Sequence, residues 1–470
     1  MWLTRAVLAA RGTFLWFMHE RLSRVLPAVA LAACGTSDVP VLSAAGDAGA
    51  AIAGDAGSRA EYCAGSGPPT LVNETDAGLV TTCAAQLAQV AFRYALCTCD
   101  GYVSSHTLTT DAFDSSKGAY DPTAPLAGGS VGTNGNLNAG AAMTIGGSLW
   151  ATDSSGLTTS ANISASGELH AKGEVHSGPM LHVGADAWLQ GGIQTSGAVT
   201  IVGTLRVPTG APVMIGGQEM VAATANGPFA VPAACDCAAE DLVDIAGFVE
   251  TYRSANDDAA AMIDPSMLEH VSTALTATIP CGRIFFTRVG ATAPIHLTVQ
   301  GRAALFVGGA LSTTSDFIVD VPLGSELDLF VEGGVDVGGE LQAGNPTNPA
   351  NARTYVGGTG TVNLQGPAQL AGNLYAPYAE IVLGGAAPAT LFGSMFAARL
   401  SSGSDLTIHY DEAILAGGAS AGCSVPSTCG TCRDCGGQSC NSGTCGGCTD
   451  SVQCCAPLVC VNGSCAAIGH

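Results

Sequence analysis

Three histidines spaced six residues apart are the first candidates for chemistry in this chain: His170, His176 and His182. Neutral imidazole is a common metal ligand, so three of them on one surface could hold a divalent cation. Their spacing argues against this, because the repeat described below turns a corner every six residues and places them on three different outer faces. We therefore expect surface histidines and no metal site.

Acidic residues are the second candidates, because polysaccharide hydrolysis requires two carboxyl groups placed around the scissile bond. Glu326, Asp328, Asp336 and Glu340 lie on or beside consecutive expected strands. The chain holds 38 acidic residues, so such proximity arises readily by coincidence. We predict no catalytic residue among them. The sequence also shows no phosphate-binding loop, nucleophile elbow or metalloprotease helix.

Two further positions combine residue types that could act on a ligand. The tripeptide His409-Tyr410-Asp411 lies near the end of the last expected strand, and we expect it to close the final coil rather than catalyse a reaction. Trp188 occupies the outward register of its strand. There it could anchor a ligand or pack beneath a loop, and the sequence leaves both open.

Apart from Cys34, the cysteines form two even sets, as expected for disulfides in an oxidising compartment. The first set of candidates is Cys63, Cys83, Cys97, Cys99, Cys235, Cys237, Cys281 and Cys423, and the second is Cys429, Cys432, Cys435, Cys440, Cys445, Cys448, Cys454, Cys455, Cys460 and Cys465. Cys97-Thr-Cys99 and Cys235-Asp-Cys237 could instead supply four thiolates to zinc. Because exported thiols usually oxidise, we expect disulfides that join two helices to the solenoid described next, and no cofactor.

The stretch between residues 156 and 207 shows which elements must position these groups, because it repeats every six residues. Large apolar residues recur at Leu157, Ile163, Leu169, Val175, Leu181, Ile193, Val199 and Leu205, with Ala187 filling the remaining slot. A polar residue and a second small or apolar residue usually follow each of them, and a turn-forming residue usually precedes. Short strands joined by tight corners at a fixed period are typical of a single-stranded β-helix, or β-solenoid.

Three hexads in one coil would place residues 18 apart above one another, with Leu157, Val175 and Ile193 in one inner column. An antiparallel sandwich is the alternative, but its strands recur at wider intervals. Outside the hexads, residues 84–97 and 238–253 have the apolar stripe of short helices. We predict a cap at 61–130, a solenoid at 131–420 with an inserted helix at 238–253, and a disulfide-rich tail at 421–470.

The N-terminus reads as an export signal. A basic stretch is followed by an apolar run too short to span a bilayer, and Leu31-Ala32-Ala33-Cys34-Gly35 resembles the bacterial lipobox. That resemblance implies removal of residues 1–33, lipidation of Cys34 and attachment to the cell envelope, at the outer membrane or cell surface. Residues 34–60 are rich in Ala, Gly, Ser and Asp and predict a flexible tether. A net charge of −22 argues against nucleic acid as a partner.

The hexads resemble those of bactofilins, which are polymer-forming bacterial β-helix proteins. Bactofilins lack a lipobox and this cysteine content, so their cytoskeletal role is not implied here. The whole chain more closely resembles secreted bacterial lipoproteins of unknown function with a β-helical domain. The stretches that carry this resemblance are Cys97-Thr-Cys99, Asp111-Ala-Phe-Asp114-Ser, Tyr375-Ala-Pro-Tyr-Ala, Phe392-Gly-Ser-Met-Phe-Ala and His409-Tyr410-Asp411. Cys448-x5-Cys454-Cys455-x4-Cys460-x4-Cys465 in the tail resembles knottin-like modules.

These observations favour a non-enzymatic envelope lipoprotein that presents a rigid solenoid for adhesion, surface assembly or matrix interaction, with glycans or envelope proteins as partners. A carbohydrate-active β-helix enzyme, acting as a hydrolase or lyase, is the first alternative. The second is a protease inhibitor or binding module acting through the tail. Carboxylates clustered in a groove would favour the enzyme, and a smooth stacked surface would favour the envelope protein.

Overall fold

We analysed a computed structural model of the chain, which describes residues 58–65, 71–73, 81–365, 369–385, 387–416, 428–435 and 438–466. These residues belong to the second of two compact units, residues 49–470. The expected lipidation site Cys34, most of the expected tether and Cys423 lie outside the described residues. Among the described residues, no helix is long and apolar enough to cross a membrane.

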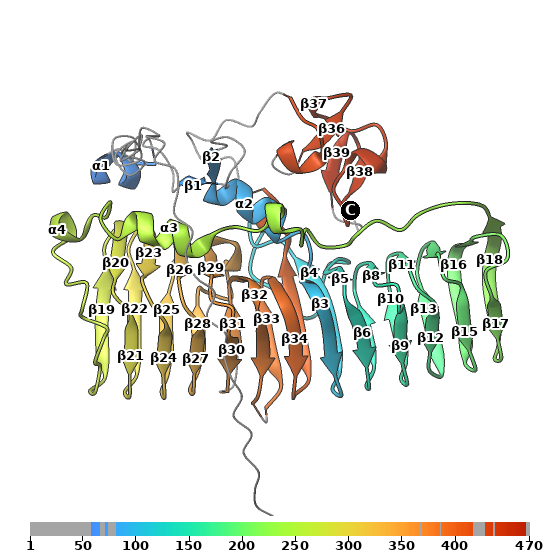
Figure 1. The fold of residues 1–470 in the computed structure, drawn as a ribbon, viewed down its shortest axis with the longest axis horizontal. Helices are drawn as coiled ribbons and strands as arrows, with labels where there is room; N and C mark the ends of the chain where they lie inside the picture. Colours follow the sequence, from blue (N-terminus) through green and yellow to red (C-terminus); the bar gives the residue numbers. More distant parts are fainter. Residues whose placement is uncertain are drawn as a thin grey trace, which may run out of the picture. The chain divides into compact units, whose positions relative to one another are not determined.

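The described chain is mainly β-structure and forms a β-solenoid of about 13 turns with three sides, as the hexads predict (Figure 1). The 18-residue register is confirmed on each side in turn. Val175 pairs with Leu157 and Ile193, Leu181 with Ile163 and Val199, and Ala187 with Leu169 and Leu205. All pairings within the solenoid are parallel, so equivalent residues of successive turns form columns.

We name the three sides by what their outward residues do. The covered side is the one over which helices and a chain segment pack. In spatial order its strands are β20 (Gly282–Phe286), β23 (Arg302–Val307), β26 (Glu326–Val331), β29 (Ala352–Val356) and the first parts of β32 (Asn373–Leu383), β34 (Met395–Ser402) and β3 (Leu96–Ser104). They continue with β5 (Val131–Thr133), β8 (Leu149–Ala151), β11 (Leu169–Ala171), β14 (Ala187–Leu189) and the last parts of β16 (Ala198–Val207) and β18 (Glu219–Asn226).

The amide side carries exposed Asn and Gln residues. It contains β21 (Val289–Ala291), β24 (Leu311–Thr313), β27 (Val335–Val337), β30 (Thr361–Leu364), the second parts of β32, β34 and β3, then β6 (Asn136–Ala139), β9 (Leu157–Thr159), β12 (Val175–Ser177), β15 (Ile193–Thr195) and β17 (Val213–Ile215).

The hydroxyl side carries outward Thr and Ser residues. It contains the separate four-stranded sheet of β19 (Leu275–Ile279), β22 (Ile295–Val299), β25 (Phe317–Asp320) and β28 (Leu341–Ala343), followed by β31 (Gln369–Ala371), β33 (Ala389–Phe392), β35 (Leu406–Asp411), β4 (Leu108–Phe113), β7 (Met143–Ile145), β10 (Ile163–Ala165), β13 (Met180–Val183) and the first parts of β16 and β18.

The order of the turns differs from the order of the sequence. The chain enters the solenoid in its middle at β3 and builds turns outward as far as β18 (Figure 1). It then returns along the covered side through residues 227–244, and starts a second set of turns at the opposite end. These run back until β34 pairs with β3 and β35 pairs with β4. The solenoid therefore takes in strands before residue 131, where we had placed its start.

The helices are shorter than the apolar stripes predicted. Of residues 84–97, only α2 (Ala84–Ala91) is helical, and Cys97 lies in β3. Of residues 238–253, only the 3-10 turn η1 (Ala239–Asp241) and α3 (Ile245–Tyr252) are helical. Helix α3 begins at Ile245 because Asp244 caps it by accepting a hydrogen bond from Gly247 N. The remaining elements outside the solenoid and the tail are α1 (Arg59–Cys63), β1 (Leu71–Asn73), β2 (Thr81–Cys83), α4 (Asp258–Ala261), η2 (Pro349–Asn351) and η3 (Glu412–Leu415).

The core is the set of inward columns, in which most side chains are inaccessible to solvent. Glycines permit the close stacking of the corners. Gly156 has a φ of +81°, and a Cβ atom there would lie 2.0 Å from the carbonyl oxygen of Glu174 in the next turn. The repeated glycine before the strand is thus required both by the turn and by the approach of the neighbouring backbone.

The tail forms a small module around two hairpins. Its elements are η4 (Cys432–Cys435), β36 (Ser439–Asn441), β37 (Thr444–Gly446), η5 (Ser451–Gln453), β38 (Val459–Val461) and β39 (Ser464–Ala466). Its ten cysteines pair with one another as Cys429–Cys440, Cys432–Cys455, Cys435–Cys445, Cys448–Cys460 and Cys454–Cys465. The five bridges are therefore internal to the tail, which compensates for its small core.

Candidate functional site

The covered side carries an outward column of aromatic residues that spans much of the solenoid. From β20 to β34 the column reads Phe285, Phe306, Phe330, Tyr355, Tyr375 and Phe396, and after Cys97 and Gly132 it continues as Trp150, His170, Trp188 and Arg206. Several neighbours stack, with ring centroids 5.2 Å apart for Phe306–Phe330 and 4.7 Å apart for Phe330–Tyr355. Exposed, such a column would be a large apolar surface.

Two helices and the return segment, residues 227–244, bury this column. Tyr252 of α3 stacks on Phe306 at 4.3 Å, and Phe92, directly after α2, contacts Tyr375 edge-on at 6.3 Å. Over the next turns, Asn134 accepts hydrogen bonds from the backbone N–H groups of Ala234 and Cys235 and donates one to Cys235 O. The aromatic column is thus a seat for the protein's own chain rather than a ligand site.

Trp188 lies on this seat, which decides between its two interpretations. Phe229 of the return segment contacts the Trp188 ring edge-on at 5.5 Å, and the Arg206 guanidinium lies 4.5 Å from the centre of that ring. His170, one turn away, is buried and stacks on Trp150 at 3.6 Å. Trp188 therefore packs beneath a chain segment, and His170 is not a surface histidine as we had expected.

The three histidines do lie on three different sides, as the spacing predicts. His176 is in β12 on the amide side and His182 is in β13 on the hydroxyl side, and both are half-exposed. His170 Nε2 lies 2.8 Å from Glu168 Oε2, and His176 Nε2 lies 3.4 Å from Glu174 Oε2. Each histidine therefore has its own environment, and the three cannot share one ion.

The hydroxyl side presents a column of short polar residues that sequence inspection missed. Pairing of successive strands aligns, in order, Thr390, Thr407, Thr109, Thr144, Ser164, His182 and Thr200. All seven are at least partly accessible. The signal is present in the sequence as a threonine between two inward residues, as in Leu406-Thr-Ile, Leu108-Thr-Thr and Met143-Thr-Ile, but these triplets are far apart in the chain.

The four candidate acids do not form a catalytic pair. Asp328, which is 1% exposed, binds Arg353 through both oxygens, at 2.6 Å to Nε and 3.0 Å to Nη2. Glu326 binds the same guanidinium. Burial alone would raise the pKa of Glu326, but the nearby Arg353 and Arg302 guanidinium groups lower it by more, so the pKa is lowered overall. Asp336 is exposed on β27 of the amide side, away from this cluster. Glu340 directly precedes β28 on the hydroxyl side.

His409 lies in a clamp where the two halves of the solenoid meet. Its Nδ1 is 2.7 Å from Asp111 Oδ1, and Tyr120 donates its hydroxyl proton to Asp111 Oδ2 at 2.6 Å. The Tyr120 ring lies tilted against the His409 ring, with centroids 3.9 Å apart. Burial and this hydrogen bond raise the pKa of Tyr120 above its usual range, so the phenol stays protonated. The cluster joins β35 to β4 and to the loop that follows β4.

The rest of the tripeptide also secures this junction. Tyr410 donates a hydrogen bond to the carbonyl oxygen of Phe92 at 2.7 Å, and Asp411 accepts backbone hydrogen bonds from Ser115, Ala350 and Ala413. These contacts tie β35 to α2, to η2 and to the loop after β4. The tripeptide therefore closes the final coil.

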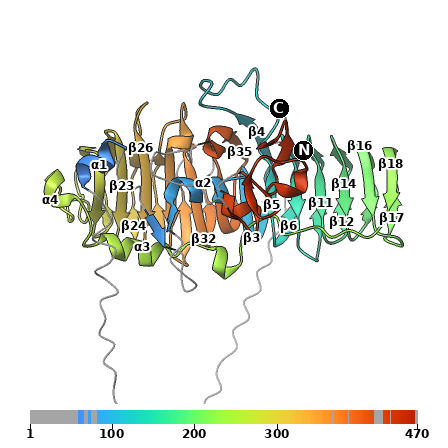
Figure 2. The same cartoon turned by 90° about the horizontal axis from the view of Figure 1, so that it is seen from above.

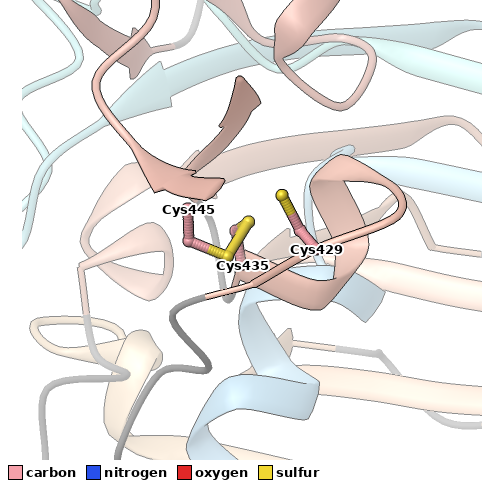
Figure 3. A group of neighbouring side chains, drawn as sticks. All are labelled: Cys429, Cys435 and Cys445. Carbon is pink, nitrogen blue, oxygen red and sulfur yellow. A yellow bond between two sulfur atoms is a disulfide. The ribbon is translucent and has the colours of Figure 1, made fainter. Parts of the chain in front are cut away.

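The sulfur atoms near one another in the tail do not make a metal site. Figure 3 shows Cys429, Cys435 and Cys445, whose sulfur atoms lie close enough to hold one ion. Each of them is in a disulfide, so no thiolate is available. The same is true of Cys448, Cys454 and Cys465. Disulfides also join Cys97 to Cys235 and Cys99 to Cys237, and they link β3 to the return segment. These four cysteines therefore have no thiolates with which to bind zinc.

An open groove of 620 Å³ lies near one end of the solenoid. Glu269, His270, Arg288 and Ser312 are among the residues that line it, and His270 Nε2 lies 3.2 Å from Arg288 Nη2. Glu269 is the acidic residue in this lining. A groove with a single carboxylate does not supply the pair that glycoside hydrolysis requires.

Comparisons with known proteins give one family match and one weak structural similarity. A protein-family model described as Domain of unknown function (DUF7305) matches residues 242–416, less than half of the chain. No curated protein matches the sequence. Among solved structures, an ice-binding protein from an Antarctic bacterium of the Flavobacteriaceae is similar at 9% identity and a TM-score of 0.13, over 68% of this chain and 96% of that one. Similarity at this level carries no functional argument.

Proposed function

We propose that this protein is a non-enzymatic component of the bacterial cell envelope that presents its solenoid to an extended surface or matrix polymer. The observation that carries the proposal is the difference between the outward residues of the three sides. One side is occupied by the protein's own helices and return segment, whereas the hydroxyl side presents a column of Thr and Ser residues with His182, and the amide side presents a mixed column that includes Asn138, Thr158 and Gln194. Rigid, repetitive and open sides suit a partner that is itself extended.

The hydroxyl side is the better candidate for such a partner. Its seven aligned residues from Thr390 to Thr200 are separated by six strand spacings of about 4.8 Å, so they extend over about 29 Å. Hydroxyl groups both donate and accept hydrogen bonds, which matches the hydroxyl groups of a polysaccharide. The column contains no acidic residue despite the net charge of −22, so it also avoids repulsion from acidic envelope polymers.

The disulfides support an extracytoplasmic location, because cytoplasmic thiols are kept reduced. We extend this to a lipid anchor at Cys34, with the following segment as a tether between membrane and solenoid. This placement rests on the lipobox alone. It would hold the solenoid at the outer membrane or cell surface, where glycans and envelope proteins are the available partners.

Binding of the purified chain to insoluble cell-wall and capsular polysaccharides, and to a glycan array, tests the proposal. The variant T109D/T144D/T200D places three negative charges on the hydroxyl side and should reduce binding at least tenfold. The matched control N138D/T158D/Q194D places three on the amide side and should bind as the wild type does. Absence of binding to every polymer, or equal losses in both variants, would contradict the proposal.

A further inference from the structure

The two ends of the solenoid are finished differently. At the capped end, residues 257–271 cover β20 and β21. Asp257 N donates to Arg283 O at 2.7 Å, Phe285 N donates to Asp258 Oδ1 at 2.9 Å, and Val271 forms a bridge with Ala291. The disulfide Cys63–Cys281 fastens α1 to the same end. Residues 257–271 therefore cover this end and bond to its backbone on the covered and amide sides.

The open end, formed by β17 and β18, has no such cover among the described residues. β17 pairs with β15 alone and β18 with β16 alone, so one edge of each strand offers unpaired backbone N–H and C=O groups (Figures 1 and 2). Large apolar side chains are also exposed here: Val213 is 41%, and Met214 and Met220 are each 50% exposed. Natural edge strands are often protected by lysine or proline, and β17 and β18 contain neither. The bulge in this region lies in β16, on the paired side of β18.

Charge at the open end differs from that of the chain as a whole. Residues 208–230 contain one charged residue, Glu219, in a chain with 38 acidic and 16 basic residues. Two copies of this end can therefore approach without the repulsion that other acidic surfaces would cause. A partner with the same edge is also the simplest source of the missing backbone hydrogen bonds.

We propose that the open ends of two copies pair antiparallel across a two-fold axis to form a closed homodimer. The strand register fixes where this axis lies. β18 pairs with β16 on both sides of a bulge, with Val221 opposite Ile201 and Ala223 opposite Thr204, so β18 bends around a corner near Ala222. An axis through this corner also passes through the middle of the opposite strand, β17, at Met214.

This axis makes a specific set of residue pairs. Met214 meets Met214 of the second copy, and around the corner Glu219 meets Asn226, Met220 meets Ala225 and Val221 meets Thr224. Inward residues meet inward residues and outward meet outward, because Glu219 and Asn226 continue the inner columns of Val199 and Val207, whereas Met220 and Ala225 continue Thr200 and Arg206. An antiparallel pair requires that agreement, since opposed residues share one face of the sheet.

The paired residues are also chemically complementary. The amide N–H of Asn226 can donate to the Glu219 carboxylate of the other copy, and the apolar groups of Val213 and Ile215 meet across β17 at the end of the core. The capped end offers no comparable edge on two of its three sides, so association stops at two copies rather than continuing into a fibre. This inference rests on the open end and is independent of the polymer-binding proposal, which rests on the hydroxyl side.

Light scattering after size exclusion, over a hundredfold range of concentration, tests the dimer with the full chain. M214K places two ammonium groups together on the axis and should raise the dissociation constant at least tenfold. M180K adds the same charge at a residue that is 40% exposed two turns away, and should leave the dimer intact. Thermal unfolding of both variants shows whether the fold is retained, and wild-type polymer binding by M214K would separate the two proposals.

Disulfide trapping tests the register itself. M214C should form an intermolecular disulfide on mild oxidation, because its two copies are opposed in one antiparallel pair. M180C should not, because five strand spacings of about 4.8 Å separate its two copies by about 24 Å along the solenoid axis alone, and the two lie on different sides. A wild-type chain that is monomeric at every concentration, or cross-linking of M214C no faster than that of M180C, would overturn the proposal.

Discussion

Replacement of Leu181 by aspartate tests the assignment of inner columns most directly. Leu181 lies in β13, is inaccessible to solvent, and is stacked in register between Ile163 and Val199. Removing a buried leucine side chain as far as Cβ costs about 2–5 kcal/mol of unfolding free energy. Leaving a buried polar group without a partner adds about 1–3 kcal/mol. We therefore expect Leu181→Asp to lower the unfolding free energy by about 5 kcal/mol.

Thr200→Asp is the matched control, because it introduces the same side chain one turn away with the opposite orientation. Thr200 is the outward neighbour of Val199 and stacks on His182, so a carboxylate there reaches water. Surface changes of this kind usually alter stability by about 0.5 kcal/mol or less. Position 200 directly follows Val199, which stacks on Leu181, so the two variants test whether inward and outward residues alternate as the hexads predict.

Urea denaturation combined with amide hydrogen exchange is the appropriate assay. Each turn contacts mainly its neighbours, so the loss should appear first as faster exchange in β10, β13 and β16 rather than as uniform unfolding. The aspartate at position 181 would be protonated in its apolar column, so its folded pKa lies above its unfolded pKa. Its deficit should consequently shrink as the pH falls from the raised folded pKa towards the unfolded pKa of about 4, and should stay constant below it. Equal losses for the two variants would refute the register.

Three further predictions concern the anchor, the tail and a buried acid. Cys34→Ser should abolish acyl labelling and move the protein from the membrane fraction to the soluble fraction, and unchanged fractionation would refute the lipobox interpretation. A chain truncated after Cys423 should keep its β-rich circular dichroism and cooperative melting, because the five tail disulfides are internal, and collapse of the β signal would show otherwise. Asp258 Oδ1 accepts a hydrogen bond from Phe285 N, and burial raises the pKa of this carboxyl group. The contribution of Asp258 to the unfolding free energy is therefore complete below its unfolded pKa and is lost as the pH rises through its folded pKa. Asp258→Asn should therefore gain stability relative to the wild type as the pH rises above the unfolded pKa of about 4 in denaturant titrations, and the opposite trend would contradict this assignment.

The inner columns could be predicted because the six-residue period is nearly unbroken where it is clearest. Val175 must lie between Leu157 and Ile193 once three hexads form one turn. The separation of His170, His176 and His182 follows from the same count. The burial of His170 does not, because it depends on a return segment whose path is absent from the repeat. Trp188 was ambiguous for the same reason.

The order of the turns could not be predicted, because parallel strands of similar composition carry no label that specifies their neighbour. The strands that begin Leu96-Cys-Thr and Met395-Phe-Ala pair although they are about 300 residues apart, and no feature of either tripeptide predicts this pairing. The clamp of Asp111, Tyr120 and His409 was missed as a unit because it forms only when the last turn meets the first. The boundaries of α2 and α3 were overestimated because their apolar stripes continue into segments buried by the solenoid.

The return of the chain along one side explains several features that otherwise look unrelated. Between β18 and β20 the chain must cross twelve strand spacings, or about 58 Å, which requires at least about 17 extended residues. A segment of that length has too little apolar surface of its own to stay in place, so it needs a continuous complementary seat. The aromatic column supplies that seat, while Cys97–Cys235 and Cys99–Cys237 hold the segment at mid-length. Because this side is committed to the protein's own chain, selection for binding can act on the hydroxyl side, the amide side and the open end, where the polar columns and the unpaired strand edges are found.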